Sequence, residues 1–215
     1  MTFVVTIAQG KGGAGKTTLG CQLAAAFIAD GLSVAAFDLD EQKSFTLWAA
    51  LRRKRLGEHA LFAVDNAVSS FSLAPALRRS AADIALIDTA PRIDATVQRA
   101  IRAADLVITP LQLSPIDLAA SLPTARAIGE AGRASLFVIN RAPPRARIAD
   151  DIRTQIERYR LPVSKAELGN RAAFAESMAV GAGVVETAPS SQAAIEARAL
   201  AHEVLARAGL SRRAA

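Results

Sequence analysis

The residues best suited to chemistry lie in one short glycine-rich stretch, AQGKGGAGKTT at 8–18, which directly follows the apolar run FVVTI at 3–7. Its core fits the pattern G-x-x-x-x-G-K-[ST] of a phosphate-binding loop, which needs a strand before it and a helix after it. Successive backbone amides can surround an anionic phosphate there, and glycine lets the backbone approach without a Cβ atom. We therefore predict a nucleotide-binding loop whose contacting residues are Gly10, Lys11, Gly12, Gly13, Ala14, Gly15, Lys16, Thr17 and Thr18.

Two carboxylates at the ends of apolar runs predict a metal site beside this loop. Asp40 follows the run VAAFD at 34–38, and Asp88 ends the run IALID at 84–88. Ligands of α/β folds bind at the carboxyl ends of parallel strands. Lys16 is then placed to neutralise the β- and γ-phosphates, and the hydroxyl of Thr17 to bind Mg²⁺. Thr17, Asp40 and Asp88 form the predicted metal site; the alternative for Asp40 is a strand-ending aspartate that caps the next helix.

The elements that must position these groups alternate between short runs rich in Val and Ile and longer helical patterns. Most runs are apolar throughout, which is typical of strands covered by helices on both faces. The alternation predicts an α/β layered fold with a mainly parallel central sheet. Together with the phosphate-binding loop it indicates a three-layer P-loop NTPase fold, in a single domain over 1–215 with a flexible tail at 211–215. Predicted strands are 3–8, 33–38, 84–88, 106–109 and 136–140, with weaker ones at 61–64 and 162–164; predicted helices are 16–30, 44–56, 95–103, 115–130, 148–158 and 190–208.

Composition bounds the class of protein. Hydrophobic residues make up 51% of the 215 residues, but no apolar run approaches the roughly 18 residues that span a bilayer. The single cysteine, Cys21, excludes an internal disulfide, and the first residues lack a signal-peptide pattern, so we expect a cytoplasmic protein without a membrane partner. The net charge is +6, and residues 141–215 hold 12 Lys and Arg against 8 Asp and Glu. Such a basic surface either attracts phosphates or serves solubility alone.

An additional lysine, Lys11, lies five residues before Lys16, and KGGAGKTT resembles the deviant Walker A motif of the ParA/MinD ATPases. The resemblance implies that Lys11 reaches across a nucleotide-sandwich dimer to the phosphates of the partner subunit. DLDEQ at 38–42 is similar to the first switch of the family, D-x-D-P-Q, with Glu41 in place of proline, and IDTAP at 87–91 is similar to its Walker B segment. The resemblance implies that Lys11, Lys16 and Asp40 are catalytic and that the cofactors are ATP or ADP and Mg²⁺.

Later segments carry the resemblance with less specific motifs. Asn140, at the end of the run FVIN, lies where relatives use a strand-end side chain near the adenine. GVVE at 183–186, together with Pro189, resembles the loop that closes over the base. Asn140 and Pro189 therefore complete the predicted cofactor-binding set.

The resemblance also implies a function. The protein is expected to be a Mg-ATP-dependent dimer that hydrolyses ATP slowly, binds nonspecific DNA in its ATP state, and partitions or positions a cargo on the nucleoid. An adaptor or activator protein, ParB-like or a cluster protein, is expected to stimulate hydrolysis. Each candidate DNA contact could instead be a solvated helix arginine, and the basic run 52–55 could instead face a protein partner. The candidate contacts are Arg171, Arg198, Arg207, Arg212 and Arg213, with Arg145 and Arg147 as further ones.

Other branches of this fold fit the sequence less well. Electron-transfer relatives need cysteine ligands, whereas Cys21 inside the first predicted helix is better explained as a small buried residue. Membrane-bound relatives carry a strongly amphipathic terminal helix, whereas the last predicted helix here is rich in alanine. The alternative function is an ATP-dependent amidating or carboxylating synthetase of cofactor biosynthesis, a class that generally lacks the lysine matched by Lys11.

Overall fold

The computed structural model describes residues 1–57, 62–65, 69, 71–142 and 147–211. Its strands are β1 (Phe3–Ile7), β2 (Val34–Asp38), β3 (Phe62–Asp65), β4 (Ile84–Asp88), β5 (Leu106–Leu111), β6 (Ala134–Ala142) and β7 (Leu168–Gly169). Its helices are α1 (Lys16–Ala29), α2 (Ser44–Leu56), α3 (Leu73–Arg79), α4 (Ala95–Ala103), α5 (Pro115–Glu130), α6 (Arg147–Arg158), α7 (Ala172–Ala179), α8 (Val184–Thr187) and α9 (Gln192–Ala208).

The strands form one sheet in the order β3-β2-β4-β1-β5-β6-β7, and every described pairing is parallel. β1 pairs with β4 from Phe3 opposite Ile84 to Ile7 opposite Asp88. β2 pairs with β4 as far as Asp38 opposite Asp88. The register therefore brings the ends of β1, β2 and β4 to one level, where the glycine-rich loop begins.

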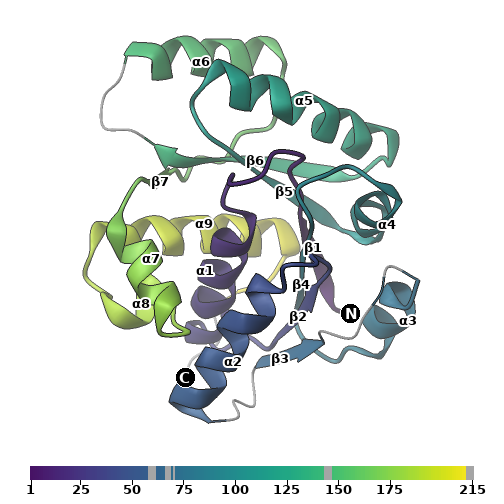
Figure 1. Ribbon diagram of the computed structural model, residues 1–215, viewed down its shortest axis with the longest axis vertical. Helices are drawn as coiled ribbons and strands as arrows, with labels where there is room; N and C mark the ends of the chain where they lie inside the picture. The colour runs from purple at the N-terminus through teal and green to yellow at the C-terminus, as the bar shows by residue number, and fades with distance from the viewer. Residues whose placement is uncertain (58–61, 66–68, 70, 143–146, 212–215) are drawn as a thin grey trace.

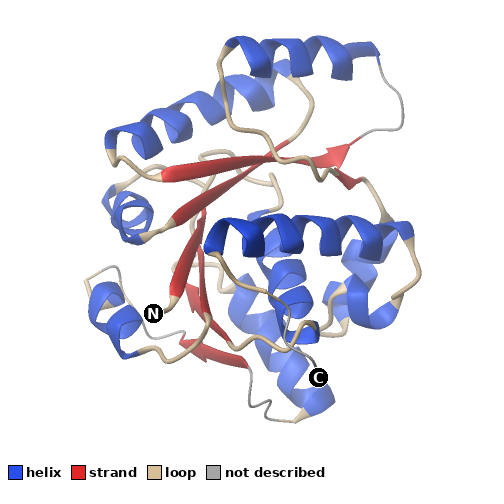
Figure 2. Cartoon of the chain, turned by 180° about the vertical axis from the view of Figure 1, so that it is seen from behind, coloured by secondary structure: helices blue, strands red, loops and turns tan. Residues whose placement is uncertain are grey.

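Helices cover both faces of this sheet (Figure 1). α1, α2, α7, α8 and α9 share one core, which includes Phe27, Trp48 and Leu200. α3, α4, α5 and α6 lie on the other face, in smaller clusters that include Ile87 and Val107. The view from behind shows the strands between these two layers (Figure 2). Right-handed crossovers explain why the helices divide between the two faces. From β1 to β3 the chain moves across the sheet in one direction, and from β3 to β7 it moves in the other, so the connecting helices change face.

The predicted fold class is confirmed, and the differences fall on short elements. The segment predicted as a strand at 162–164 forms a single bridge, from Val163 to Phe137. α3, α7 and α8 are not indicated by the sequence pattern, because helices of four to eight residues depend on tertiary packing more than on propensity. α9 begins at Gln192, two residues later than predicted, because the Ser191 hydroxyl accepts a hydrogen bond from the amide of Ala194 and caps the helix.

Two predictions fall partly outside the described residues: position 61 of the weak strand, and 212–215 of the tail. In the part of the chain that the structure describes, no helix combines the length and the apolar character needed to cross a bilayer.

Candidate nucleotide site at the carboxyl ends of the strands

The glycine-rich loop joins β1 to α1, as predicted. Gly13 and Gly15 have φ angles of 73° and 92°, in the left-handed region that other residues rarely adopt. A Cβ atom at Gly15 would lie 2.3 Å from Asn140 Nδ2, so glycine is required there by space as well as by conformation. The loop borders a cavity of about 240 Å³, here named the phosphate cavity, which is lined by Gly12, Gly13, Gly15, Lys16, Thr17, Thr18, Asp40, Gln42, Pro91 and Arg141.

Side chains from the second half of the chain hold the loop in shape. Asn140 Nδ2 donates a hydrogen bond to the carbonyl of Ala14 at 2.8 Å, and Gln112 Nε2 donates to the carbonyl of Gly13 at 3.2 Å. The loop also starts from a fixed point, because buried Gln9 donates to the carbonyl of Pro110 at 3.1 Å. These bonds order the loop before a ligand arrives, which reduces the free-energy cost of binding.

Thr17 and Asp88 meet beneath the loop. The Thr17 hydroxyl donates to Asp88 Oδ2 at 2.6 Å. Burial raises the pKa of Asp88 to about 7, against the lowering effect of the Thr17 hydrogen bond. Burial also lowers the pKa of the Lys16 ammonium, although Asp88 and Asp40 act in the opposite direction. A buried carboxylate that is destabilised when charged gains from a nearby cation, and hydroxyl and carboxylate oxygens are the ligands that Mg²⁺ prefers. These residues therefore fit a magnesium ion.

The two aspartates of the first switch segment have different surroundings. Asp38 is fully buried and accepts hydrogen bonds from the amide and the hydroxyl of Thr46, both at 2.9 Å, so it fixes the start of α2. Asp40 lines the phosphate cavity, and its carboxylate accepts a bond from the amide of Gln42 at 3.0 Å. Asp38, and not Asp40, therefore caps the start of α2, and Asp40 lines the phosphate cavity.

Glu41, which stands where the family motif has proline, links the first switch segment to the segment that follows β4. Its carboxylate contacts the guanidinium of Arg92 at 2.7 Å, and Arg92 also contacts Asp94 at 2.5 Å. Asp94 caps α4 by accepting from the amide of Val97, so the pairing ties the segment after β2 to the start of α4. All three side chains are exposed or half-exposed, and an ion pair in such a setting adds little stability.

The Lys11 side chain is half-exposed, and its ammonium is paired within its own subunit. Lys11 Nζ lies 2.8 Å from Asp117 Oδ1, and the Asp117 side chain is largely buried at the start of α5. The other carboxylate oxygen of Asp117 accepts a very short hydrogen bond from the Ser114 hydroxyl. Asp117 therefore holds the Lys11 ammonium against the start of α5, and Lys11 is not among the residues that line the phosphate cavity.

A second cavity of about 220 Å³ adjoins the loop next to Asn140, and its lining differs from the expected one. The predicted loop over the base, with Pro189, does not line it, and Pro189 is exposed. The cavity, here named the side cavity, is lined by Gly15, Thr18, Leu19, Asn140, Arg141, Leu168, Gly169, Asn170, Arg171, Ala172, Phe174 and Ala175.

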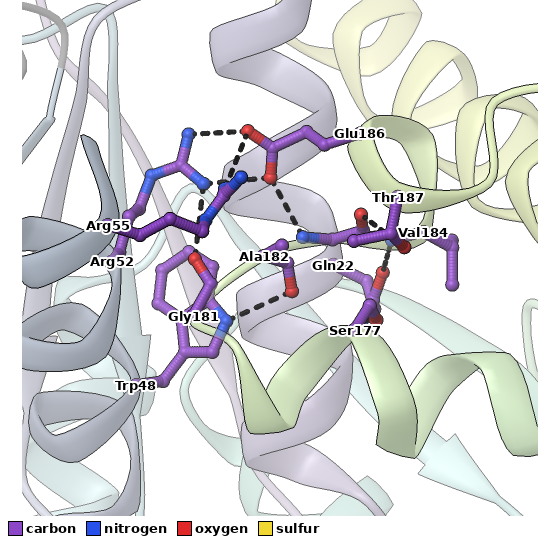
Figure 3. A network of polar contacts seen from close by, with 11 residues as sticks. Gln22, Trp48, Arg52, Arg55, Ser177, Gly181, Ala182, Val184, Glu186 and Thr187 are labelled. Carbon is purple, nitrogen blue, oxygen red and sulfur yellow. Dashed lines mark hydrogen bonds and ion pairs between the residues drawn. The ribbon is translucent and has the colours of Figure 1, made fainter.

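The reason for this difference is that α8 is held against α2 (Figure 3). Glu186 accepts two hydrogen bonds from the buried guanidinium of Arg52, at 2.8 and 2.9 Å, and also lies 3.6 Å from Arg55. Trp48 Nε1 donates to the carbonyl of Ala182 at 3.1 Å. Gly181 makes the close approach possible, because its φ is +64° and a Cβ there would lie 2.2 Å from the amide nitrogen of Arg52. Arg52 and Arg55 of the basic run 52–55 therefore pair with Glu186 of the same chain.

Sequence reasoning missed Arg141, which lines both cavities. Its φ is +52°, uncommon for a residue with a side chain. An arginine that follows a strand-end asparagine carries no motif, so only the three-dimensional arrangement identifies it.

The predicted DNA-contacting arginines do not form one cluster of unpaired charges. Arg171 pairs with Glu196 at 2.6 Å, and Arg207 pairs with Glu203 at 3.4 Å. Arg198 donates to the carbonyl of Pro189 at 2.7 Å. Arg145, Arg212 and Arg213 lie outside the described residues, and of Arg147 only its place at the start of α6 is described.

Comparisons with known proteins agree with this site. Residues 1–210 match the VirC1 protein family. Protein virC1 of Rhizobium rhizogenes is 33% identical over 175 residues, 79% of this chain and 69% of that protein. The chromosome-partitioning ATPase Soj of Thermus thermophilus is 27% identical over 237 residues, with 94% and 95% covered. The maintenance of carboxysome distribution protein A of Halothiobacillus neapolitanus is 26% identical over 213 residues, with 94% and 96% covered.

Solved structures show the same fold. A putative plasmid partition protein of Borrelia burgdorferi, bound to AMPPNP, superposes with a TM-score of 0.74 at 17% identity and covers 96% of this chain and 100% of that chain. Cobyrinic acid a,c-diamide synthase of Mycobacterium smegmatis, with an ATP analogue and magnesium, gives 0.75 at 21% identity, with 95% and 94% covered. The fold alone therefore does not separate a partition ATPase from a synthetase.

Fold, phosphate loop and relatives together make this protein a P-loop ATPase of the ParA/MinD type. Because the family match spans nearly the whole chain, the protein belongs to the VirC1 family of these partition and positioning ATPases.

Proposed function

We propose that two copies of the chain close over two ATP molecules and that this dimer partitions or positions a cargo on nonspecific DNA. The observation that carries the proposal is Lys11, a half-exposed ammonium in the glycine-rich loop that is paired with Asp117 and does not line its own subunit's phosphate cavity. Lys16 alone would be enough to neutralise the phosphates of its own subunit's ATP. The second lysine, Lys11, is therefore available for the ATP of a second copy. If the Lys11 ammonium leaves Asp117 and binds the phosphates of a second copy's ATP, dimerisation depends on ATP.

The chemistry follows from groups around the phosphate cavity. Phosphoryl transfer to water needs positioning and charge neutralisation more than covalent chemistry. Lys16 and the partner's Lys11 neutralise phosphate oxygens, and Asp40 orients the attacking water. Thr17 and Asp88 would hold Mg²⁺, which supplies further neutralisation of the phosphates. Hydrolysis is slow in this scheme, because an adaptor protein must complete the arrangement, and hydrolysis then releases the dimer.

The test is ATP turnover and ATP-dependent dimerisation, measured by light scattering, for Lys11→Ala, Lys16→Ala and Asp40→Ala. Lys16→Ala is expected to lose nucleotide binding, Lys11→Ala to bind ATP but remain monomeric, and Asp40→Ala to dimerise without turnover. Lys54→Ala, at an exposed lysine of α2, is the matched control. Dimerisation of the Lys11 variant to the same extent as the unsubstituted protein would contradict the proposal.

The second candidate function is the amidating or carboxylating synthetase, which the likeness to cobyrinic acid a,c-diamide synthase supports. Lys11 favours the dimerising ATPase, since synthetases on this fold generally lack it. Turnover that depended on a small carboxylic acid, and not on DNA or a second protein, would favour the synthetase.

A further inference from the structure

Four arginines gather on α3 and α4. Arg78 and Arg79 lie in the last turn of α3, and Arg102 lies in the last turn of α4, with Arg99 one turn earlier. Neither helix contains an aspartate or a glutamate. We name these four side chains the α3/α4 surface.

The two helices lie on the same sheet face and share one buried cluster. Leu73 and Ala76 of α3 share a buried cluster with Ala100 of α4, on the sheet face opposite α1. Both views place α3 and α4 on the same side of the molecule (Figure 1, Figure 2). The guanidinium of Arg99 lies 4.1 Å from the ring centroid of Phe71, in the turn that leads into α3. Arginine and an aromatic ring in this position attract each other and fix the two helices relative to one another.

Three of the four arginines have no ion-pair partner among the described residues. Arg78, Arg79 and Arg102 are exposed, and none of them forms an ion pair with another described residue. The carboxylates at this edge of the sheet, Asp83 and Asp105, accept hydrogen bonds from the backbone amides of Ser33 and Val4.

The contrast with α9 is informative. Its two arginines, Arg198 and Arg207, are matched by Glu196 and Glu203 on the same helix. Glu203 pairs with Arg207, and Glu196 pairs with Arg171. Charge alone therefore favours the α3/α4 surface over Arg171, Arg198 and Arg207 as the place where a polyanion binds.

We propose that the α3/α4 surface binds the phosphate backbone of double-stranded DNA, an inference that rests on the proposed function and gives its DNA contact a place. A duplex carries a charge every ~1.7 Å, so cations on two helices of the same sheet face can reach several phosphates. Guanidinium groups bind phosphate oxygens through two parallel hydrogen bonds. Because these contacts go to phosphates, the binding does not depend on base sequence.

The surface also stays open in the proposed dimer. The last turns of α3 and α4 lead into the amino ends of β4 and β5, whereas the phosphate loop lies at the carboxyl end of β1. A second copy that closes over the nucleotide therefore covers the opposite edge of the sheet. The dimer presents two such surfaces, and two linked contacts bind DNA more tightly than one.

An acidic protein is the other polyanion that could bind here. Protein interfaces have a buried apolar centre that supplies most of the affinity. On the described part of this surface, Phe71 is a large exposed apolar side chain, and Arg99 already lies over its ring. Arg79 also borders a cavity of about 430 Å³ that is lined largely by apolar residues of β2 and β3, but neither Arg78 nor Arg102 lines it. Two of the three arginines without an ion-pair partner therefore lie away from an apolar hollow, which suits nucleic acid better than protein.

The test is binding of a fluorescent DNA duplex of mixed sequence to the full chain with ATP, titrated with salt. The triple variant Arg78→Gln, Arg79→Gln, Arg102→Gln is expected to bind about tenfold to a hundredfold more weakly and to reduce the salt slope by about 2–3. The triple lysine variant at the same positions keeps the charge and is expected to retain most of the binding. A control variant, Arg53→Gln, Lys54→Gln, Arg158→Gln, removes the same charge from exposed residues on α2 and α6 and is expected to change the slope much less.

ATP-dependent dimerisation and turnover of the glutamine variant should match the unsubstituted protein, which separates lost DNA contact from lost folding. If the unsubstituted protein with ATP fails to bind the duplex, the DNA part of the proposed function itself is wrong. If it binds and the glutamine variant binds with the same slope, only the placement on the α3/α4 surface is wrong. Loss of binding to poly-glutamate with unchanged DNA binding would assign the surface to an acidic protein and also overturn the inference.

Discussion

The phosphate cavity and the side cavity are built in different ways, although they share Gly15, Thr18 and Arg141. The phosphate cavity is lined almost entirely by residues before position 92, in segments that directly follow β1, β2 and β4. The side cavity depends on Asn140, Arg141 and the segment from Leu168 to Ala175, which are far from the loop in sequence. The first is made by local backbone geometry, and the second by tertiary packing.

This difference explains which parts of the site can be read from a sequence. A phosphate is bound by backbone amides and by one or two charges, which need glycines at fixed spacing and therefore leave a motif. A surface that packs beside a nucleotide base needs only a complementary shape. Many different side chains can supply that shape, so it leaves no motif in the sequence. Predictions for the phosphate cavity should therefore involve large effects, and those for the side cavity smaller ones.

Gly15 is shared by the two cavities and gives the largest expected effect. Gly15→Ala places a Cβ atom 2.3 Å from Asn140 Nδ2 and forces alanine to a φ of 92°. We expect ATP affinity, measured by calorimetry, to fall by more than about a hundredfold, which corresponds to about 2.7 kcal/mol. The left-handed conformation alone costs about 1–2 kcal/mol.

Gly132→Ala is the matched control for this substitution. Gly132 also has a positive φ, of 63°, but an added Cβ there would meet no atom within 4 Å. The control should lower the thermal midpoint without changing ATP affinity. Equal loss of affinity in both variants would show that general strain, and not the junction of the cavities, controls binding.

The fold shows the same division between local pattern and packing. The strand that precedes Asp40 and the strand that ends in Asp88 are continuous apolar runs, and their pattern predicts both the parallel sheet and the edge where these carboxylates lie. The position of residues 183–186 could not be predicted in this way. It depends on the pair of Glu186 with Arg52, which are 134 residues apart, and on the close approach at Gly181. Their spacing in the sequence gives no sign of this contact.

Asp88 gives the second prediction, on the pH dependence of stability without nucleotide. Burial raises its pKa from 3.8 to about 7, so the folded state holds a proton that the unfolded state releases between these values. This contribution is fully present below pH 3.8 and is lost as the pH rises to about 7. From pH 5 to pH 7 the free energy of unfolding is expected to fall by roughly 2–3 kcal/mol, and Asp88→Asn should remove this slope.

Urea unfolding at several pH values measures the effect. Asp105→Asn, which changes a carboxylate that is exposed and accepts a bond from the amide of Val4, is the control and should keep the slope of the unsubstituted protein. A slope that persists in Asp88→Asn would mean that another group titrates.

Substitution of Asn140, which lines the side cavity, is expected to have an intermediate effect on ATP affinity, because Asn140 supports the loop through one hydrogen bond. Asn140→Ala removes the 2.8 Å hydrogen bond to the carbonyl of Ala14. One such bond is worth about 1 kcal/mol, so we expect ATP affinity to fall about fivefold. Asn140→Asp also removes the donor and adds a negative charge, so it should weaken ATP binding further than alanine does. An alanine variant with unchanged affinity would show that the loop keeps its shape without this support.

Arg141 gives the smallest effect and separates charge from conformation. Arg141→Gly removes a cation that lines both cavities and also relieves a backbone φ of +52°. Arg160 has the same φ of +52° and is exposed, but it lines neither cavity, so Arg160→Gly reproduces the conformational change alone. Both variants should gain a similar small amount of stability, since glycine adopts this conformation without strain.

The two glycine variants should differ in nucleotide binding. A partly exposed charge beside phosphates contributes about 0.5–1 kcal/mol, so Arg141→Gly is expected to weaken ATP binding about twofold to fivefold. The loss should shrink as salt rises, because salt screens an exposed charge, whereas the loss in Asn140→Ala should not. Equal ATP affinity in Arg141→Gly and Arg160→Gly would mean that the guanidinium does not reach the nucleotide, and that Arg141 lines the two cavities without acting in either.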